Sequence, residues 1–147
     1  MRLLLSIAGF CAALSAAALA DPKDEALAVL DRWTAAFAAS DVDAITQLYA
    51  PDALFMGTGS KTVVSDTASI RQYFEDAILT RRPRAAPISS SNVMVLSDTA
   101  VLIAGLNTST GVSDGQTFSN PGRVTFVIAK RGSEWKIAHF HRSAMPK

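Results

Sequence analysis

The spacing of apolar side chains changes once along this chain of 147 residues, and that change limits the folds open to it. Up to Pro83, apolar residues recur every three or four positions, as they do on one face of a helix. From Ala85 onward they alternate with polar residues, as they do in half-buried strands. Helices followed by hairpin-linked strands are typical of the α+β class. We therefore expect an α+β domain whose three N-terminal helices pack on one face of an antiparallel sheet; if that sheet is curved around them, a cone-shaped barrel results.

Boundary residues set the expected elements. Asp21, Asp41 or Asp43, and Asp66 are candidate helix caps, since an aspartate oxygen accepts from the first free backbone N–H groups. The pattern predicts helices over 21–40, 41–49 and 66–82, and strands over 53–56, 88–96, 99–110, 117–130 and 134–143. Because proline cannot donate to a ladder, Pro121 should lie at a sheet edge or a bulge.

The first 20 residues have the three regions of a secretory signal peptide. Arg2 is the positive region, 3–14 is the apolar region, and Ala18 and Ala20 form a small-residue cleavage site. We expect cleavage after Ala20, which would leave one periplasmic or secreted domain over 21–147; an uncleaved anchor is the alternative. The only cysteine, Cys11, would leave with the signal, so the mature domain would have no disulfide.

Charge and ligand types exclude several partner classes. Without Arg2 the chain has 13 basic and 13 acidic residues, so it lacks the basic excess of a nucleic-acid-binding protein. No nucleic acid is expected as a partner, and no membrane after cleavage. Nor do we expect a metal or another cofactor, because no third ligand is spaced to join the two histidines.

The last predicted strand resembles a known one. Residues 135–146 read Trp-Lys-Ile-Ala-His-Phe-His-Arg-Ser-Ala-Met-Pro, and this run is similar to the C-terminal strand of the calcium/calmodulin-dependent protein kinase II association (hub) domain. The Tyr-Phe-Glu run at 73–75 also matches that domain, while 41–55 resembles the wider nuclear transport factor 2-like and SnoaL-like superfamily. The resemblance implies a cystatin-like cone, a deep pocket and a dimer through the sheet.

The chain also departs from the hub pattern. The pocket of the hub uses several arginines, a histidine and a tryptophan, and only Arg142 clearly matches one of them. Ile70 and Ile78 stand where the histidine and tryptophan would be, and Leu106 and Asn107 lie near an expected arginine. The resemblance therefore does not carry the acid-binding residues of the hub over to this chain.

Two kinds of side chain on the last strands are candidates for ligand chemistry. Alternation places His139 and His141 on one face with Ile137, and Arg142 on the other with Phe140. A pocket histidine can act as a general base, although a hydrogen-bonded histidine on the dimer face is the simpler interpretation. Arg142 is the stronger ligand candidate.

Each arginine candidate has a structural alternative. Arg142 would bind a ligand anion, or else a helix acid such as Asp52 or Glu75, because a buried guanidinium needs a partner. Arg123 would join it at the pocket mouth, or else lie solvated on its strand.

Aromatic residues at core-type spacing are expected in the interior, and four of them are candidate pocket walls: Trp33, Tyr49, Phe55 and Tyr73. Two functions remain open on these residues. The first is an exported, self-associating domain, a homodimer or a larger homo-oligomer, that binds a small apolar or weakly anionic molecule. The alternative is a cofactor-independent SnoaL-like lyase, isomerase or cyclase with a histidine as base. A purely structural domain would instead have a filled cone.

Overall fold

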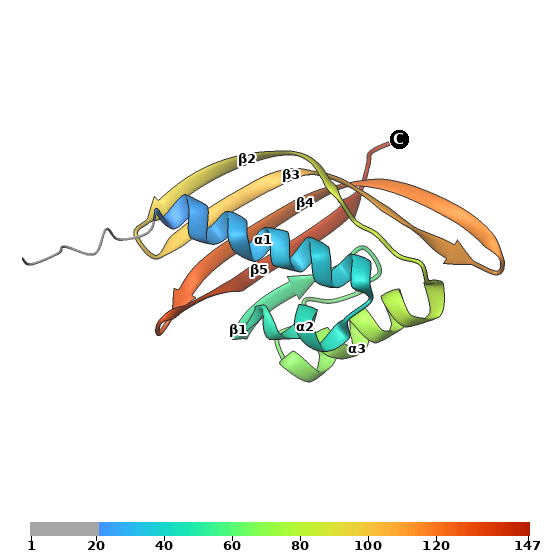
Figure 1. The fold of residues 1–147 in the computed structure, drawn as a ribbon, viewed down its shortest axis with the longest axis horizontal. Coiled ribbons are helices and arrows are strands. Elements are labelled where there is room, and N and C mark those ends of the chain that lie inside the picture. The colour runs from blue at the N-terminus through green and yellow to red at the C-terminus, as the bar shows by residue number, and fades with distance from the viewer. Residues whose placement is uncertain (1–20) are drawn as a thin grey trace, which may run out of the picture.

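The computed structural model describes residues 21–147; the expected signal segment, 1–20, lies outside the described residues. Three helices come first along the chain and four of the five strands come last, as expected (Figure 1). Within 21–147, no helix is long and apolar enough to cross a membrane. The elements are α1 (Pro22–Ala39), α2 (Val42–Gln47), β1 (Tyr49–Met56), α3 (Thr67–Ile78) with a 3-10 turn (Leu79–Arg81), β2 (Ile88–Ser97), β3 (Ala100–Ser113), β4 (Gln116–Arg131) and β5 (Glu134–Ala144).

Each helix begins at an aspartate that the sequence predicted as its cap. Asp21, Asp41 and Asp66 accept from the backbone N–H of the second or third helical residue at 2.8–2.9 Å. Ser40 ends α1 in the left-handed conformation, with φ at 56°. Local chemistry therefore sets the three helix starts before any tertiary contact is made.

The junction of α2 and β1 differs from the prediction. Tyr49 was expected at the end of the second helix, and the following strand was expected to begin at Ala53. In the structure α2 ends at Gln47 and Tyr49 already begins β1, where it pairs with Ile137. Pairing with the last strand outweighs the weak helical pattern of a six-residue helix.

The sheet has the order β1-β5-β4-β3-β2. The strands β2 to β5 form the expected antiparallel meander. However, β1 pairs with β5 in parallel, so the expectation of a wholly antiparallel sheet was wrong at this edge. The reason is connectivity: the chain leaves β1 through α3 rather than through a hairpin, so no tight turn forces opposite directions.

A bulge in β5 changes which side chains face inward. Val127 pairs with His139 but Ile128 pairs with Ile137, so Ala138 is an extra residue in the strand. As a result Ile137 and Phe140, which strict alternation placed on opposite faces, are both buried in the core. The predicted grouping of Ile137 with the two histidines was therefore wrong.

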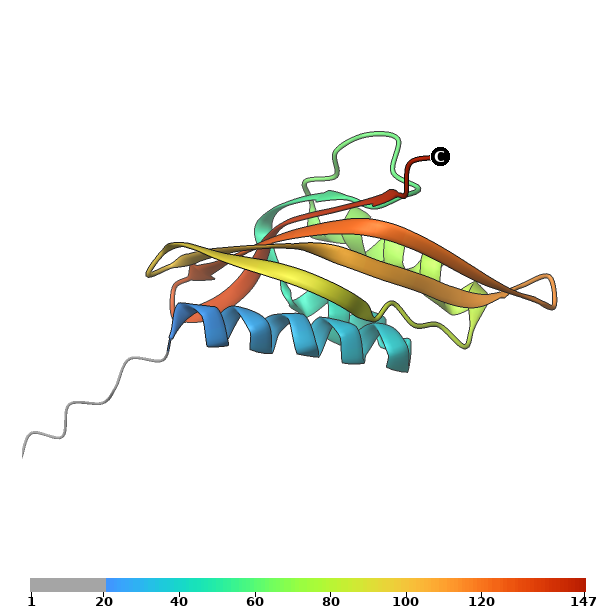
Figure 2. The same cartoon turned by 90° about the horizontal axis from the view of Figure 1, so that it is seen from above.

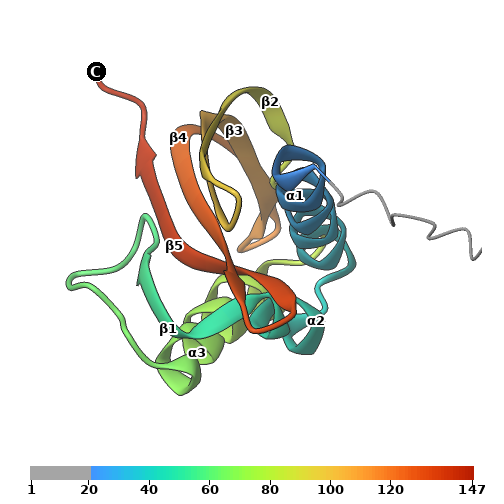
Figure 3. The ribbon, with the colours of Figure 1, turned by 90° about the vertical axis from the view of Figure 1, so that its left-hand side faces the viewer.

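The sheet bends around the helices, which all lie on its concave side (Figures 2 and 3). Beyond the helices, the β3–β4 hairpin continues as a two-stranded arm (Figure 1). Pairing of β4 with β5 starts only at Gly122, so Pro121 lies where β4 is locally an edge strand, as predicted. A cluster of aromatic rings fills the cone beside β1 and β5, with Phe140 5.0 Å from Phe126 and 5.1 Å from Phe55 between ring centroids.

Candidate functional site

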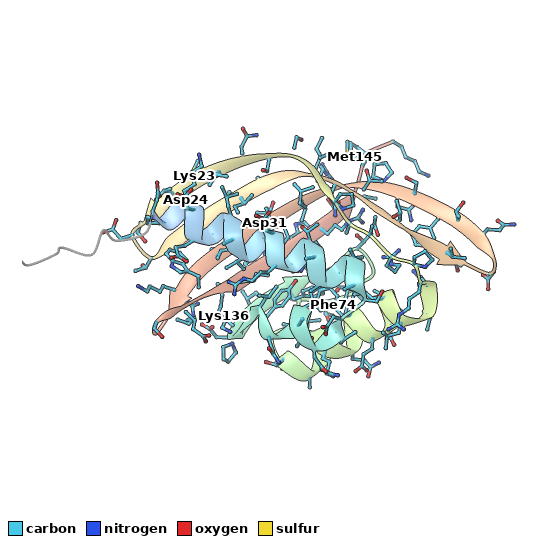
Figure 4. The ribbon with its side chains drawn as sticks, in the orientation of Figure 1. Lys23, Asp24, Asp31, Phe74, Lys136 and Met145 are labelled. Atoms are coloured by element: carbon cyan, nitrogen blue, oxygen red, sulfur yellow. The ribbon has the colours of Figure 1, made fainter. Side chains whose placement is uncertain are left out.

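The aromatic cluster fills only part of the cone. A cavity of about 720 Å³ lies between α1, α3 and the concave face of the sheet, at the end where β5 finishes. The loop after β1, the residues after α3 and the arm of β4 complete its wall. Figure 4 labels two lining residues from distant parts of the chain, Phe74 on α3 and Met145 after β5. This volume is typical of small-molecule sites, and the filled cone expected of a purely structural domain is not what the described residues form.

Aromatic side chains form most of the apolar wall. Of the four predicted wall residues, Trp33 and Tyr73 line the cavity, whereas Tyr49 and Phe55 lie buried in the core. The indole N–H of Trp33 donates to the hydroxyl of Tyr49 at 3.0 Å, and burial raises the pKa of Tyr49 well above its ordinary value. Sequence reasoning missed four further wall aromatics: Phe37, Phe74, Phe118 and Phe140.

Arg142, the stronger ligand candidate of the sequence, lines the cavity. Its Nε donates to Oδ1 of Asn107 at 3.0 Å, its Nη1 to Oγ1 of Thr58 at 2.6 Å, and its Nη2 to the backbone oxygen of Asn120 at 2.7 Å. Partial burial lowers the pKa of Arg142. The guanidinium is thus held entirely by neutral groups within the described part of the chain.

The alternative partners of Arg142 are engaged elsewhere. Asp52 forms an exposed ion pair with Arg131 at 3.0 Å, and Glu75 pairs with Arg71 at 2.9 Å. The predicted salt bridge from Arg142 to a helix acid is therefore not formed. The charge of Arg142 remains uncompensated by any carboxylate between residues 21 and 147.

Arg84 is the second cavity arginine, and sequence reasoning missed it. The residue is 7% exposed. Its Nη1 donates to the backbone oxygen of Thr110 and its Nη2 to Oγ of Ser109, both at 2.9 Å. Its guanidinium carbon lies 5.3 Å from the centroid of Phe37 and 4.9 Å from that of Phe118. The only signal was an arginine just after a helix-ending proline, and such a residue is more often solvated.

The pKa of Arg84 is lowered, chiefly by burial and then by the nearby charge of Arg81. Its Nε is buried and has no hydrogen-bond partner among the described residues. Buried cations in folded proteins are normally paired with an opposite charge. The described residues provide no such partner for Arg84.

Asn107 lies on the inward face of β3 and is 1% exposed. Arginine nitrogens can only donate, so the amide oxygen of Asn107 must be the atom facing Nε of Arg142. That contact leaves Nδ2, which has no partner in residues 21–147, on the opposite side of the amide. The sequence marked Asn107 only as a departure from the hub pattern.

The electrostatic balance of the cavity is positive. Arg81, Arg84 and Arg142 line it, against the single acid Asp76, which is exposed and accepts from Nε2 of Gln72 at 3.0 Å. In an aromatic-walled space of low dielectric, two partly buried cations attract an anion much more strongly than surface arginines do. The arrangement suits a ligand with a negative group and an apolar body.

The remaining predicted residues lie on the convex face. Arg123 is exposed, whereas His139 and His141, which pair with Val127 and Thr125, are half-buried; none of the three lines the cavity. The geometry therefore gives no support to a histidine base acting in the cavity. Burial and the neighbouring His141 lower the pKa of His139. Among residues 21–147, no group of three potential metal ligands comes together.

Comparison with known proteins gives a consistent family. A model of the SnoaL-like domain matches residues 26–147. A search of curated proteins finds no match. A Xanthomonas campestris structure assigned as a calcium/calmodulin-dependent protein kinase II association domain is 33% identical, with a TM-score of 0.76, covering 84% of this chain and 87% of that one.

Two more distant structures share the fold. A nuclear transport factor 2-like superfamily protein from Salmonella enterica is 21% identical with a TM-score of 0.75, covering 85% of this chain and 92% of that one. A nuclear transport factor 2-like protein with a cystatin-like fold from Novosphingobium aromaticivorans is 12% identical with a TM-score of 0.69, covering 83% and 80%. Together with the topology, they establish the cystatin-like α+β fold.

The buried bond between Trp33 and Tyr49 supports a stability prediction. Tyr49→Phe leaves the indole N–H without its acceptor, so the free energy of unfolding should fall by about 1–3 kcal/mol in urea titrations. Tyr73→Phe is the matched control, because the Tyr73 hydroxyl has no recorded hydrogen bond in the described chain; its loss should stay below about 0.5 kcal/mol. Equal losses in both variants would contradict the assignment.

His139 generates a prediction on pH. Its pKa in the folded state lies below the ordinary 6.5, so on acidification the unfolded chain takes up the proton first. The free energy of unfolding should therefore decline as pH falls below about 6.5 and through the lowered pKa, and be independent of this group at higher pH. Urea titrations at several pH values should show a smaller decline for His139→Asn, with Lys23→Gln as an exposed control that keeps the parent profile. A His139→Asn profile identical to the parent refutes the prediction.

Proposed function

The chain belongs to the SnoaL-like domain family, and on that fold we propose that its cavity binds a small anionic molecule with an apolar body. The fold itself does not select this function, because the same architecture serves unrelated activities. The proposal rests on one observation: a buried arginine, Arg84, faces an aromatic-walled cavity, and no carboxylate within residues 21–147 pairs with it.

The anionic half of the proposal follows from the cost of burying charge. A guanidinium removed from water loses solvation that neutral hydroxyl and carbonyl partners only partly replace. Among the described residues, Arg84 has only such partners, Ser109 and Thr110, and the nearby Arg142 has no partner of opposite charge either. A ligand anion would supply the opposite charge that both cations lack, so its binding would be electrostatically favourable.

The apolar half follows from the walls. Six aromatic side chains line the cavity, and Phe37 and Phe118 lie close to the Arg84 guanidinium. Rings in such positions exclude water and bury a hydrophobic ligand body. A volume of about 720 Å³ leaves room for a body of one or two rings or a short chain.

The second part of the proposal is self-association through the convex face of the sheet. Five residues that are paired in register across neighbouring strands, one from each strand, form a continuous row on this face: Met94, Leu102, Val127, His139 and Leu54. All of them except His139 are apolar. Met94 and Leu54 are 60% and 47% exposed. An uncovered apolar row across a whole sheet supports pairing with a second copy of the chain.

We also propose export, with removal of residues 1–20, on the basis of the three regions of the signal sequence. The enzymatic alternative relied on a pocket histidine. Because both histidines lie on the convex face, we do not propose a lyase, isomerase or cyclase.

Ligand class can be tested with three probes that share one body: 2-naphthoate, 2-naphthamide and 2-naphthylmethylamine. We expect only the acid to raise the thermal midpoint, since ligand that binds the folded state alone stabilises it. Arg84→Met should abolish this rise while leaving the unliganded midpoint equal or higher, because an unpaired buried charge is removed. Arg131→Met, an exposed arginine distant from the cavity wall, should keep it. A parent protein that responds equally to amine and acid contradicts the proposal.

Self-association can be tested by sedimentation velocity. The parent should form a dimer or larger assembly, and Leu102→Glu should weaken it at least tenfold by placing a charge in the apolar row. Val63→Glu makes the same change at a side chain that is 53% exposed in the loop after β1 and should have no effect. A parent that stays strictly monomeric at high concentration contradicts this part.

A further inference from the structure

We propose that the anionic group of the ligand is a carboxylate, bound between the amide Nδ2 of Asn107 and the Nε of Arg84, and that Arg142 positions the Asn107 amide for it. This inference rests on the proposed function and names the ligand class and the residues that select it.

Two donors in this cavity are buried without a partner, and they are the only two such side-chain atoms in the described part of the chain: Nδ2 of Asn107 and Nε of Arg84. Folded proteins satisfy nearly all buried polar atoms. Both residues line the same cavity, so both donors lack an acceptor at the same part of its wall. The two unpartnered atoms are both donors, so this wall requires acceptors.

The two donors are held from one stretch of β3. Asn107 and Ser109 lie two residues apart on the inward face of that strand, which is about 6.8 Å along it. Ser109 anchors Arg84 through Nη2 at 2.9 Å, so the Arg84 guanidinium lies at the next inward position to Asn107. This spacing brings the amide and the guanidinium to neighbouring parts of the wall.

The orientation of Asn107 depends on Arg142. A free asparagine amide can rotate and present either oxygen or nitrogen, but Nε of Arg142 accepts nothing and so selects the oxygen. Thr58 and the Asn120 carbonyl hold the other two nitrogens of Arg142, which fixes the guanidinium itself. Arg142 therefore acts on the ligand through Asn107, in addition to its charge.

A carboxylate fits these donors better than a phosphate does. A carboxylate has two oxygens in one plane and a single negative charge, which two donors and adjacent guanidinium groups satisfy. A phosphate monoester has three free oxygens and nearly two charges, and the wall offers no further buried free donor among the described residues. The rings of Phe37 and Phe118 beside Arg84 would cover the ligand body next to its acid group.

The test uses 2-naphthoate, 2-naphthamide and 2-naphthyl phosphate, with affinity measured by titration calorimetry. The parent should bind the carboxylate at least tenfold more tightly than either analogue. Asn107→Asp keeps the oxygen that Arg142 needs but replaces the donor with a negative acceptor, and should lose binding at least tenfold. Asn120→Asp adds the same charge to the same cavity and leaves its backbone contact with Arg142 intact; its loss should be threefold or less.

A second measurement remains informative if a variant folds poorly. In the parent, the side-chain N–H signals of Asn107 and of Arg84 Nε should shift on addition of 2-naphthoate in nitrogen–proton NMR spectra, and should not shift with 2-naphthamide. If these signals stay unchanged at a saturating concentration of 2-naphthoate, the carboxylate does not bind at Asn107 and Arg84, even if it binds elsewhere in the cavity.

The positioning role of Arg142 is tested by a double-mutant cycle. Arg142→Lys should weaken 2-naphthoate at least tenfold in the parent, and by clearly less in the Asn107→Leu background, where no amide remains to be oriented. Equal losses in both backgrounds would show that Arg142 acts independently of Asn107.

The outcomes separate the two proposals. If the parent binds 2-naphthoate and both Asn107 variants bind it equally well, the carboxylate site at Asn107 and Arg84 is wrong, while the proposal of an anion-binding cavity is retained. Tighter binding of 2-naphthyl phosphate than of 2-naphthoate also overturns the carboxylate assignment alone. If the parent binds neither anion, both the proposed function and the proposed carboxylate site are wrong.

Discussion

The interior of this domain depends on one extra residue in its last strand. Because Ala138 is bulged, β5 turns both Ile137 and Phe140 into the core and then continues with Arg142 on the inner face. Phe140 lies within 5.6 Å of Trp33, Phe126 and Phe55 between ring centroids, so it joins the helix, the sheet and the parallel edge strand in one aromatic cluster. The same shift turns His139 outward. Given Ile137 in the core, this local irregularity decides that the Arg142 guanidinium, and not the imidazoles, faces the cavity.

From that cluster the structure becomes progressively more polar toward the mouth of the cone. Phe140 is followed on the same face by Arg142, and on β3 the buried Ile103 is followed inward by Asn107 and Ser109. These polar groups are adjacent to rings and hold one another through neutral hydrogen bonds. The fold therefore bears an electrostatic penalty at the end of the cone that an apolar core would avoid, as expected where function and stability conflict.

How far the sequence predicts this depends on whether a feature is local or tertiary. The aspartate caps, the change of period and the meander are encoded within a few residues, and all were predicted correctly. The parallel pairing of β1 and the early end of α2 depend on contacts between segments almost ninety residues apart, as in Tyr49 with Ile137. The bulge at Ala138 lies within the β4–β5 hairpin, but it breaks the strict alternation on which the sequence prediction relied. Of the candidate site, Arg142, Trp33 and Tyr73 follow from alternation and helix spacing. Arg84 and Asn107 do not, because their importance lies in hydrogen bonds that they lack.

The hub pattern has an arginine near position 107 that this chain lacks, and the structure shows which residue places a positive charge there instead. The sequence reasoning treated Leu106 and Asn107 as a loss of positive charge relative to the hub pattern. In the structure Arg84, which reaches the same face of β3 from the segment after α3, restores a cation beside Asn107. A charge can thus move from a strand to a connecting segment while the field inside the cavity keeps its sign. Since Coulomb energy depends on where a charge lies in space and not on its place in the chain, aligned positions alone underestimate how basic such a pocket is. Asn107, which occupies the strand position, then makes the donor geometry more specific, because its oriented amide presents its N–H group in one direction where a guanidinium would present N–H groups in several.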